Sequence, residues 1–173
     1  SGDAHAGWLN SAALRRFGLA ERSDPLTEAE WFAALPALLA EEDAQVGPGA
    51  YTAAIGAAAA LGIVGVCDYE FEPGFATWPQ RFARAGVPLR IRTSTYPVNL
   101  AAALAAGLAT GSLPDPEQPL LTMGSLKIIS DGSLNTRTAH CCEAYPGGGH
   151  GVQNVPPADL AELLGLASRS GLD

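Results

Sequence analysis

One apolar run in the sequence contains a lysine, and a carboxylate follows shortly after the run ends. Residues 126–129 have the length of a strand and contain Lys127, and a polar, glycine-containing loop with Asp131 at its start follows. Strand side chains alternate between the two faces, so Lys127, Ile129 and Asp131 are expected on one side. The spacing predicts an amine and a carboxylate on one wall, near the carboxyl end of a strand.

Two interpretations of Lys127 are open. Its neighbours Leu126, Ile128 and Ile129 make both faces of the run apolar, as in a covered parallel strand. Burial disfavours the charged ammonium, and a neutral amine is a nucleophile or a precursor of a metal ligand. The alternative is an edge-strand lysine whose charged end reaches water. The apolar neighbours favour the functional interpretation.

Composition and charge limit the kind of protein. The chain has 173 residues, of which 47% are hydrophobic, enough for a core in one domain or one large piece of a bigger domain. We expect no membrane span and no signal peptide, because no apolar segment is long enough and the first residues are polar. A net charge of -8 argues against a nucleic-acid partner. Three cysteines, two of them adjacent, suggest no disulfide framework, which predicts a reducing, cytoplasmic setting.

The first third of the chain predicts two helices and a polar loop. Asn10 or Ser11 can cap a short helix, and the loop before it contains His5 and Trp8. Thr27 and Glu30 have the spacing of a capping box at the start of a second helix. Pro36 should kink or divide that helix.

Helices and strands alternate through the rest of the chain. Strands are predicted over residues 63–69, 89–96 and 126–129, and helices over residues 51–61, 78–85, 100–108 and 157–170. Such alternation indicates parallel strands joined by right-handed crossovers. Both a doubly wound open sheet and a stretch of a (β/α)8 barrel fit. The nucleotide-binding glycine fingerprint is missing after every strand, which favours the barrel, and either fold puts its site at the strand ends that carry Asp68, Tyr96 and Asp131.

With these residues in view, the sequence resembles the metal-dependent hydrolases of amidohydrolase family 3, a group that includes the YtcJ-like proteins and N-substituted formamide deformylase. Four segments carry the resemblance: DAHAGWLNSAAL at residues 3–14, LGIVGVCDYE at 61–70, LRIRTSTYP at 89–97 and GSLKIISDGSLNTRTA at 124–139. The last segment is the most specific, because it follows the family pattern K-x-x-x-D-G-S-L-x-x-R-T-A. The resemblance runs over nearly the whole chain.

The resemblance implies a fold, a reaction and a metal. The fold is a distorted (β/α)8 TIM-type barrel in which Ile63, Leu89 and Lys127 mark strands two, three and four. The reaction is hydrolysis of an amide-type C–N bond by a metal-activated water, with one or two divalent ions, of which zinc is the expected one. In many members of the wider superfamily the lysine of strand four takes up carbon dioxide and becomes a carbamate that bridges two metals, and Lys127 matches this position.

The same resemblance implies roles for five further residues. Asp131 would orient the loop or the carbamate, and Arg137 would hold an anionic substrate group or pair within the loop. His5 and Trp8 would contact the substrate, and Asp68, at the end of its strand, is another candidate for substrate binding. We expect a small amide-like substrate.

Several parts of the family pattern are not in this sequence. The H-x-H of strand one, the histidines of strands five and six and the aspartate of strand eight have no counterparts, so most metal ligands are expected outside the chain. A barrel of this kind takes about 250 residues. We therefore expect residues 1–173 to be the central segment of a longer enzyme, inactive alone, whose partners are the remainder of the polypeptide and, as a candidate assembly, a second copy.

Three rival functions use other residues or none. A zinc site could be built from His140, Cys141, Cys142 and His150, although adjacent cysteines seldom bind one zinc together. A cysteine hydrolase could use Cys141 or Cys142 with one of these histidines. A non-catalytic barrel that has lost metal binding is the third.

Overall fold

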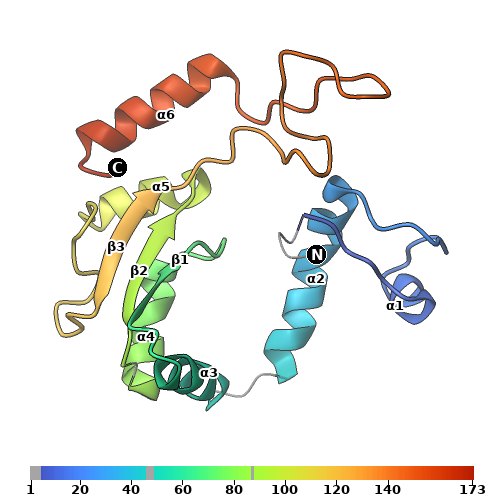
Figure 1. The fold of residues 1–173 in the computed structure, drawn as a ribbon. Helices are drawn as coiled ribbons and strands as arrows, with labels where there is room; N and C mark the ends of the chain where they lie inside the picture. The colour runs from blue at the N-terminus through green and yellow to red at the C-terminus, as the bar shows by residue number, and fades with distance from the viewer. Residues whose placement is uncertain (1–4, 46–48, 87) are drawn as a thin grey trace. The chain divides into compact units, whose positions relative to one another are not determined.

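The computed structural model describes residues 5–45, 49–86 and 88–173, which form two compact units (Figure 1). Unit 1 comprises Ser1–Gln45 and Ile129–Pro156, and unit 2 comprises Val46–Ile128 and Pro157–Asp173. Unit 2 contains the sheet, and each unit is described by itself.

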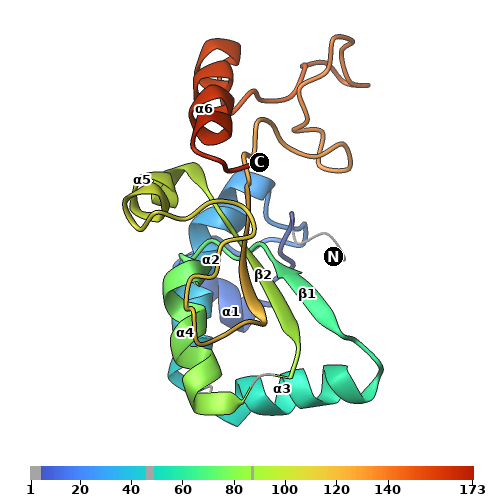
Figure 2. The same cartoon turned by 90° about the vertical axis from the view of Figure 1, so that its left-hand side faces the viewer.

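Unit 2 is built on a parallel sheet of three strands. The strands are β1 (Gly65–Asp68), β2 (Arg90–Thr95) and β3 (Leu121–Leu126), and they lie side by side in the order β1-β2-β3. The helices of this unit are α3 (Gly49–Ala60), α4 (Gly74–Ala85), α5 (Pro97–Ala105) and α6 (Pro157–Arg169). The predicted alternation of helices with parallel strands is confirmed (Figures 1 and 2).

Helices of unit 2 cover one face of the sheet. Ile91 on β2 is fully buried and packs in a cluster with Trp78 and Phe82 of α4, and Met123 on β3 packs with Leu100 of α5. The strand register pairs Ile91 with Leu121 and Thr93 with Met123, so these residues share the helix-covered face. Figure 2 shows α4 and α5 together on one side of the strands. We call the opposite side the inner face.

The third strand lies earlier in the sequence than predicted. β3 ends at Leu126, and Lys127 follows it, so the prediction of a strand over residues 126–129 is wrong. The backbone N–H of Lys127 still donates a hydrogen bond to the carbonyl oxygen of Thr95, at 2.7 Å. Ile129 then belongs to unit 1. The apolar residues after Lys127 gave a strand pattern although they are not in a strand. Thr122, Gly124 and Ser125 lie in the real strand, but their residue types give only a weak strand pattern.

The buried contact between β2 and α4 predicts a large stability effect. Ile91→Ala should lower the free energy of unfolding by about 2–5 kcal/mol, because it removes buried methyl groups and leaves a cavity beside Trp78. Urea unfolding measures this effect, and Val98→Ala is the control, since Val98 is largely exposed on α5 and should change little. Equal midpoints for the two variants would contradict this account of the core.

Unit 1 contains α1 (Ser11–Arg16) and α2 (Glu28–Gln45). The carbonyl oxygen of the Asn10 side chain accepts a hydrogen bond from the Ala13 N–H at 2.9 Å, which confirms the predicted cap. Thr27 and Glu30 exchange the two bonds of a capping box, at 2.7 and 3.4 Å, as predicted. Pro36 lies inside α2 and does not divide it, because a proline removes its own N–H bond while neighbouring turns keep theirs. The alternative of a kink at Pro36 stays a prediction.

The rest of unit 1 is a long loop after β3. Asp131 pairs with Gln153 in an isolated antiparallel bridge, and the Val152 N–H donates to the carbonyl oxygen of Thr138 at 2.8 Å. Farther along, the Cys141 N–H donates to the carbonyl oxygen of His150 at 2.9 Å. These backbone hydrogen bonds hold residues 131–138, which carry the D-G-S-L-N-T-R-T pattern, in one conformation.

Candidate functional site

Tyr96 ties together the carboxyl ends of β1 and β2. It follows β2 directly, and its hydroxyl donates a hydrogen bond to the carbonyl oxygen of Tyr69 at 2.7 Å. Burial raises the pKa of Tyr96, and the nearby carboxylates of Glu70 and Asp68 raise it further. Tyr96 therefore remains a neutral hydrogen-bond donor at neutral pH, and it fixes the turn after β1 to the end of β2.

Lys127 lies at the same end of the sheet and on the inner face. Leu126 is level with Thr95 on the helix-covered face, so the next side chain points the other way. The Lys127 Nζ lies 4.9 Å from the centre of the Tyr69 ring, a distance at which an ammonium is attracted to an aromatic face. The position at the carboxyl end of a parallel strand agrees with the prediction.

The Lys127 side chain is exposed in this chain, where β3 ends one residue earlier, so the burial expected for it is not observed within residues 1–173. The role of Lys127 as a metal ligand stays a prediction.

Asp68 faces the helices instead. Its register partner is Thr93, and its carboxylate accepts hydrogen bonds from the Trp78 indole N–H at 2.5 Å and from the Glu70 N–H at 2.9 Å. The carboxylate thus anchors α4 and the turn after β1. Asp68 and Lys127 are on opposite faces of the sheet, and substrate binding by Asp68 stays a prediction.

Glu28 is the hub of unit 1. One carboxylate oxygen lies 2.5 Å from His5 Nδ1, and the other accepts hydrogen bonds from the hydroxyls of Thr138 and Thr136. The Glu28 side chain is 13% exposed and that of His5 is 30% exposed. Burial alone would raise the pKa of Glu28, but the hydrogen bonds from Thr138 and His5 outweigh it, and the pKa lies below its ordinary value.

Sequence reasoning missed Glu28 altogether. It lies next to Thr27 and inside the capping box, where an acidic residue is expected for the helix terminus alone. Its partner Thr138 is 110 residues away in the sequence, so no local spacing indicates the contact. Through Glu28, the structure joins the loop of His5 to the segment with the D-G-S-L-N-T-R-T pattern.

Asp131 braces its own loop. One of its oxygens accepts a hydrogen bond from the His140 N–H at 3.0 Å, and the other lies 3.3 Å from the Ser130 hydroxyl. These bonds hold Asp131 within its loop, and its role in orienting the loop or the carbamate stays a prediction. Lys127 and Asp131 were predicted on one side of the same strand. They belong to different units, so neither unit contains both side chains.

Arg137 and Trp8 are both exposed residues of unit 1. Arg137 has a backbone φ of 58°, and its guanidinium donates to the carbonyl oxygen of Pro146 at 3.1 Å. That bond is to a backbone carbonyl, so the alternative of a salt bridge within the loop stays a prediction. The Trp8 indole is 76% exposed. Their contacts with a substrate stay predictions.

Gly132 allows the loop to pass close to Thr138. A Cβ atom at Gly132 would lie 2.5 Å from the Thr138 Cβ and 2.7 Å from its carbonyl carbon. Gly132→Ala should therefore lower the urea midpoint, with a cost of about 1–3 kcal/mol, and should disturb the contact between Thr138 and Glu28. Gly56→Ala is the comparison, because Gly56 lies in open space inside α3, where alanine is favoured by roughly 0.5–1 kcal/mol and should not lower the midpoint. A Gly132 variant that unfolds at the wild-type midpoint would show that the close approach to Thr138 does not contribute to stability.

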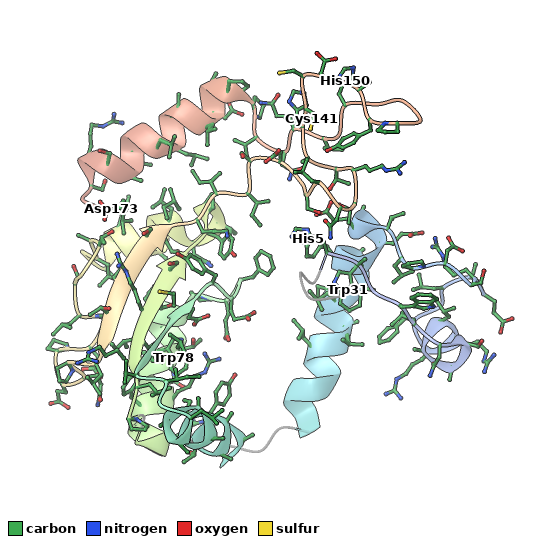
Figure 3. All side chains as sticks on the ribbon, viewed as in Figure 1. His5, Trp31, Trp78, Cys141, His150 and Asp173 are labelled. Atoms are coloured by element: carbon green, nitrogen blue, oxygen red, sulfur yellow. The ribbon has the colours of Figure 1, made fainter. Side chains whose placement is uncertain are left out.

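The described residues give no support to the two cysteine-based rivals. Among the residues that the structure describes, no three His, Cys, Asp or Glu side chains gather as a metal site would require. The Cys141 thiol donates to the Tyr145 hydroxyl at 3.3 Å, whereas the His150 ring bonds to the carbonyl oxygen of Cys141 at 3.1 Å (Figure 3). The hydrogen bond with Cys141, followed by burial, raises the pKa of Tyr145 to about 12. Among the described contacts, the Cys141 thiol bonds to a tyrosine hydroxyl and to no histidine ring.

The described residues fit a metal centre only in part. Lys127 stands where a strand-end ligand would, but without modification an ammonium is not a ligand, and the described part of the chain offers no group of three donors around it. Any metal held here would take most of its ligands from outside residues 1–173.

A parallel sheet with crossover helices on one face and polar side chains at the strands' carboxyl ends is the arrangement of a portion of a (β/α) barrel. The sequence model of the amidohydrolase family matches residues 1–173, and the chain belongs to that family. No curated protein sequence gives a significant match.

Two solved structures show the same fold. An uncharacterized metal-dependent hydrolase from Pyrococcus horikoshii OT3 is 19% identical, with a TM-score of 0.66 over 95% of this chain and 35% of that chain. Another from Pyrococcus furiosus is 16% identical, with a TM-score of 0.59 over 98% of this chain and 37% of that chain. The chain thus spans about a third of the length of these relatives. None of the described helices has both the length and the hydrophobicity needed to cross a bilayer.

Proposed function

We propose that residues 1–173 are the central segment of a metal-dependent amidohydrolase that cleaves a C–N bond of a small amide-type substrate. The observation that carries the proposal is Lys127, the only lysine in the sequence, on the inner face at the carboxyl end of β3. Membership of the amidohydrolase family and similarity to metal-dependent hydrolases support it.

Lys127 is proposed to hold a divalent metal, with zinc the expected ion, after carboxylation. In that step the Nζ atom forms a bond to the carbon of carbon dioxide and releases a proton to solvent, so an amine becomes an anionic oxygen ligand. A bound metal supplies a Lewis acid and lowers the pKa of water from about 15.7 to ~7. The remaining ligands, for one ion or two, come from the rest of the polypeptide.

The residues of unit 1 are proposed to position the substrate. Glu28 fixes the orientation of the His5 ring through Nδ1, and Thr136 and Thr138 fix Glu28 in turn. The Trp8 ring offers an apolar surface, and Arg137 offers a cation for an anionic substrate group. We further propose a cytoplasmic setting, since the three cysteines are free, and a homodimer stays a prediction.

Metal removal and restoration test the proposal on the full-length protein. Hydrolysis of a panel of N-acyl amides should disappear after treatment with a chelator and return on addition of zinc, manganese or cobalt. Esters of the same acids serve as the comparison for the type of bond. Amide hydrolysis that is unchanged after verified metal removal would overturn the proposal.

A non-catalytic barrel is the second candidate. It is favoured by one observation, the exposure of Lys127 in this chain. A full-length protein that binds no divalent metal and hydrolyses no member of the panel would support it.

A further inference from the structure

Two arginines occupy the inner face of β2. Ile91 faces the helices, so the alternation of a strand puts Arg90 and Arg92 on the other side. The register places Arg90 level with Gly65, and Arg92 level with Cys67 of β1. Both arginines are exposed, and no carboxylate of the described residues pairs with either guanidinium.

Glycines flank these two side chains. A Cβ at Gly65 of β1 would lie 3.1 Å from the Arg90 Cβ, and a Cβ at Gly124 of β3 would lie 3.3 Å from the Arg92 Cγ and 2.7 Å from the Ser94 hydroxyl. Side chains at either glycine would crowd the arginine stems. The neighbouring strands thus leave room on the inner face for two long cationic side chains.

The sheet is open at β1. Within the described residues this strand pairs with β2 alone. The side chain of Val66 is 40% exposed, and that of Val64, just before the strand, is 69% exposed. Similar solved chains are nearly three times as long, since this chain covers 35% and 37% of them. A (β/α)8 barrel closes by adding strands at such an edge, and closure would enclose Arg90 and Arg92.

An enclosed guanidinium needs a carboxylate partner, because an unpaired buried charge is strongly unfavourable. Within unit 2, the acids with described bonds have other partners. Asp68 accepts a hydrogen bond from the Trp78 indole N–H, and Glu72 pairs with Arg81.

We propose that Arg90 and Arg92 form the basic half of an ion-pair layer inside the barrel, and that Asp or Glu side chains of the strands that complete the barrel form the acidic half. This inference rests on the proposed function only in taking the chain as part of a longer barrel. Inner layers are built from alternate strands. β2 is strand three of the predicted order, so the partners are expected on strands one, five and seven.

Thermal unfolding of the full-length protein tests the charge pairing. Arg92→Met should lower Tm by roughly 5–10 °C, because it leaves buried carboxylates unpaired. Arg92→Lys keeps the charge and should lose much less, and Arg84→Met, an exposed change on α4, is the control. An Arg92→Met protein as stable as wild type would overturn the proposal, and so would equal losses, or equal failure to fold, for Met and Lys.

A thiol probe tests whether the inner face is enclosed. Cys67 is level with Arg92 and is exposed in this chain. If the other strands enclose the inner face, iodoacetamide should leave Cys67 unmodified in the native full-length protein and should modify it after unfolding. Peptide mass mapping measures the modification. Rapid modification of native protein would overturn the enclosure. Both measurements are independent of metal. A stable metal-free protein in which Arg92→Met loses more Tm than Arg92→Lys would refute the proposed function and keep this inference. A metal-dependent enzyme without that difference would keep the proposed function and refute this inference.

Discussion

Replacing Lys127 with alanine in the full-length enzyme should reduce kcat/KM for the amide substrate by at least ~10³-fold. Loss of a single preorganised electrostatic group in an active site costs about 10²–10³-fold, and loss of a metal ligand should cost at least as much. Steady-state kinetics on the substrate found with the N-acyl amide panel measures it. Residues 1–173 contain no other lysine.

Rescue and a control make this result specific. Added acetate or propionate should restore part of the activity of the Lys127→Ala variant, because a free carboxylate can take the place of the missing carbamate. Arg84→Ala, which removes an exposed cation from α4, should leave kcat/KM unchanged. Retention of activity within about tenfold of wild type would show that Lys127 is not a ligand.

Replacing Glu28 with alanine should have the largest effect on unit 1. The change removes the carboxylate that bonds to His5, Thr136 and Thr138, and a part-buried group left without its partner costs roughly 1–3 kcal/mol. Chemical unfolding measures the stability, and a raised KM in the full-length enzyme would reflect the lost orientation of His5. Glu21→Ala is the control, because the exposed pair of Glu21 and Arg15 should contribute less than about 1 kcal/mol. Equal losses of stability in the Glu28→Ala and Glu21→Ala variants would contradict the claim that Glu28 holds unit 1 together.

The lowered pKa of Glu28 also predicts a dependence on pH. An unfolded glutamate titrates at about 4.3, and the folded group titrates lower, so the contribution of Glu28 is fully present above about pH 4.3. It is lost as pH falls from there through the folded pKa. Wild type should therefore lose more stability over this acidic window than Glu28→Gln. Parallel stability curves for the two proteins would contradict the assignment.

Local patterns predicted most of the fold. The Asn10 cap and the capping box of Thr27 and Glu30 depend on neighbours within a turn, and the structure has both. The alternation of helices and strands predicted a parallel sheet, because parallel strands require crossovers of this length. These features follow from interactions that are close in the sequence.

Features that depend on register or on distant contacts were not predictable. Asp68 does lie at the end of β1 as predicted, but its face is decided by pairing with Thr93. The true third strand contains Thr122 and Gly124, which have weak strand signals alone and are held by β2. The contact of Glu28 with Thr138 spans 110 residues and required the folded loop.

Metal content of the purified full-length protein tests the central claim most directly. Inductively coupled plasma mass spectrometry should find one or two divalent ions per chain in the wild type, with zinc the expected element, and close to none in a folded Lys127→Ala variant. A variant that keeps the wild-type metal content would contradict the account.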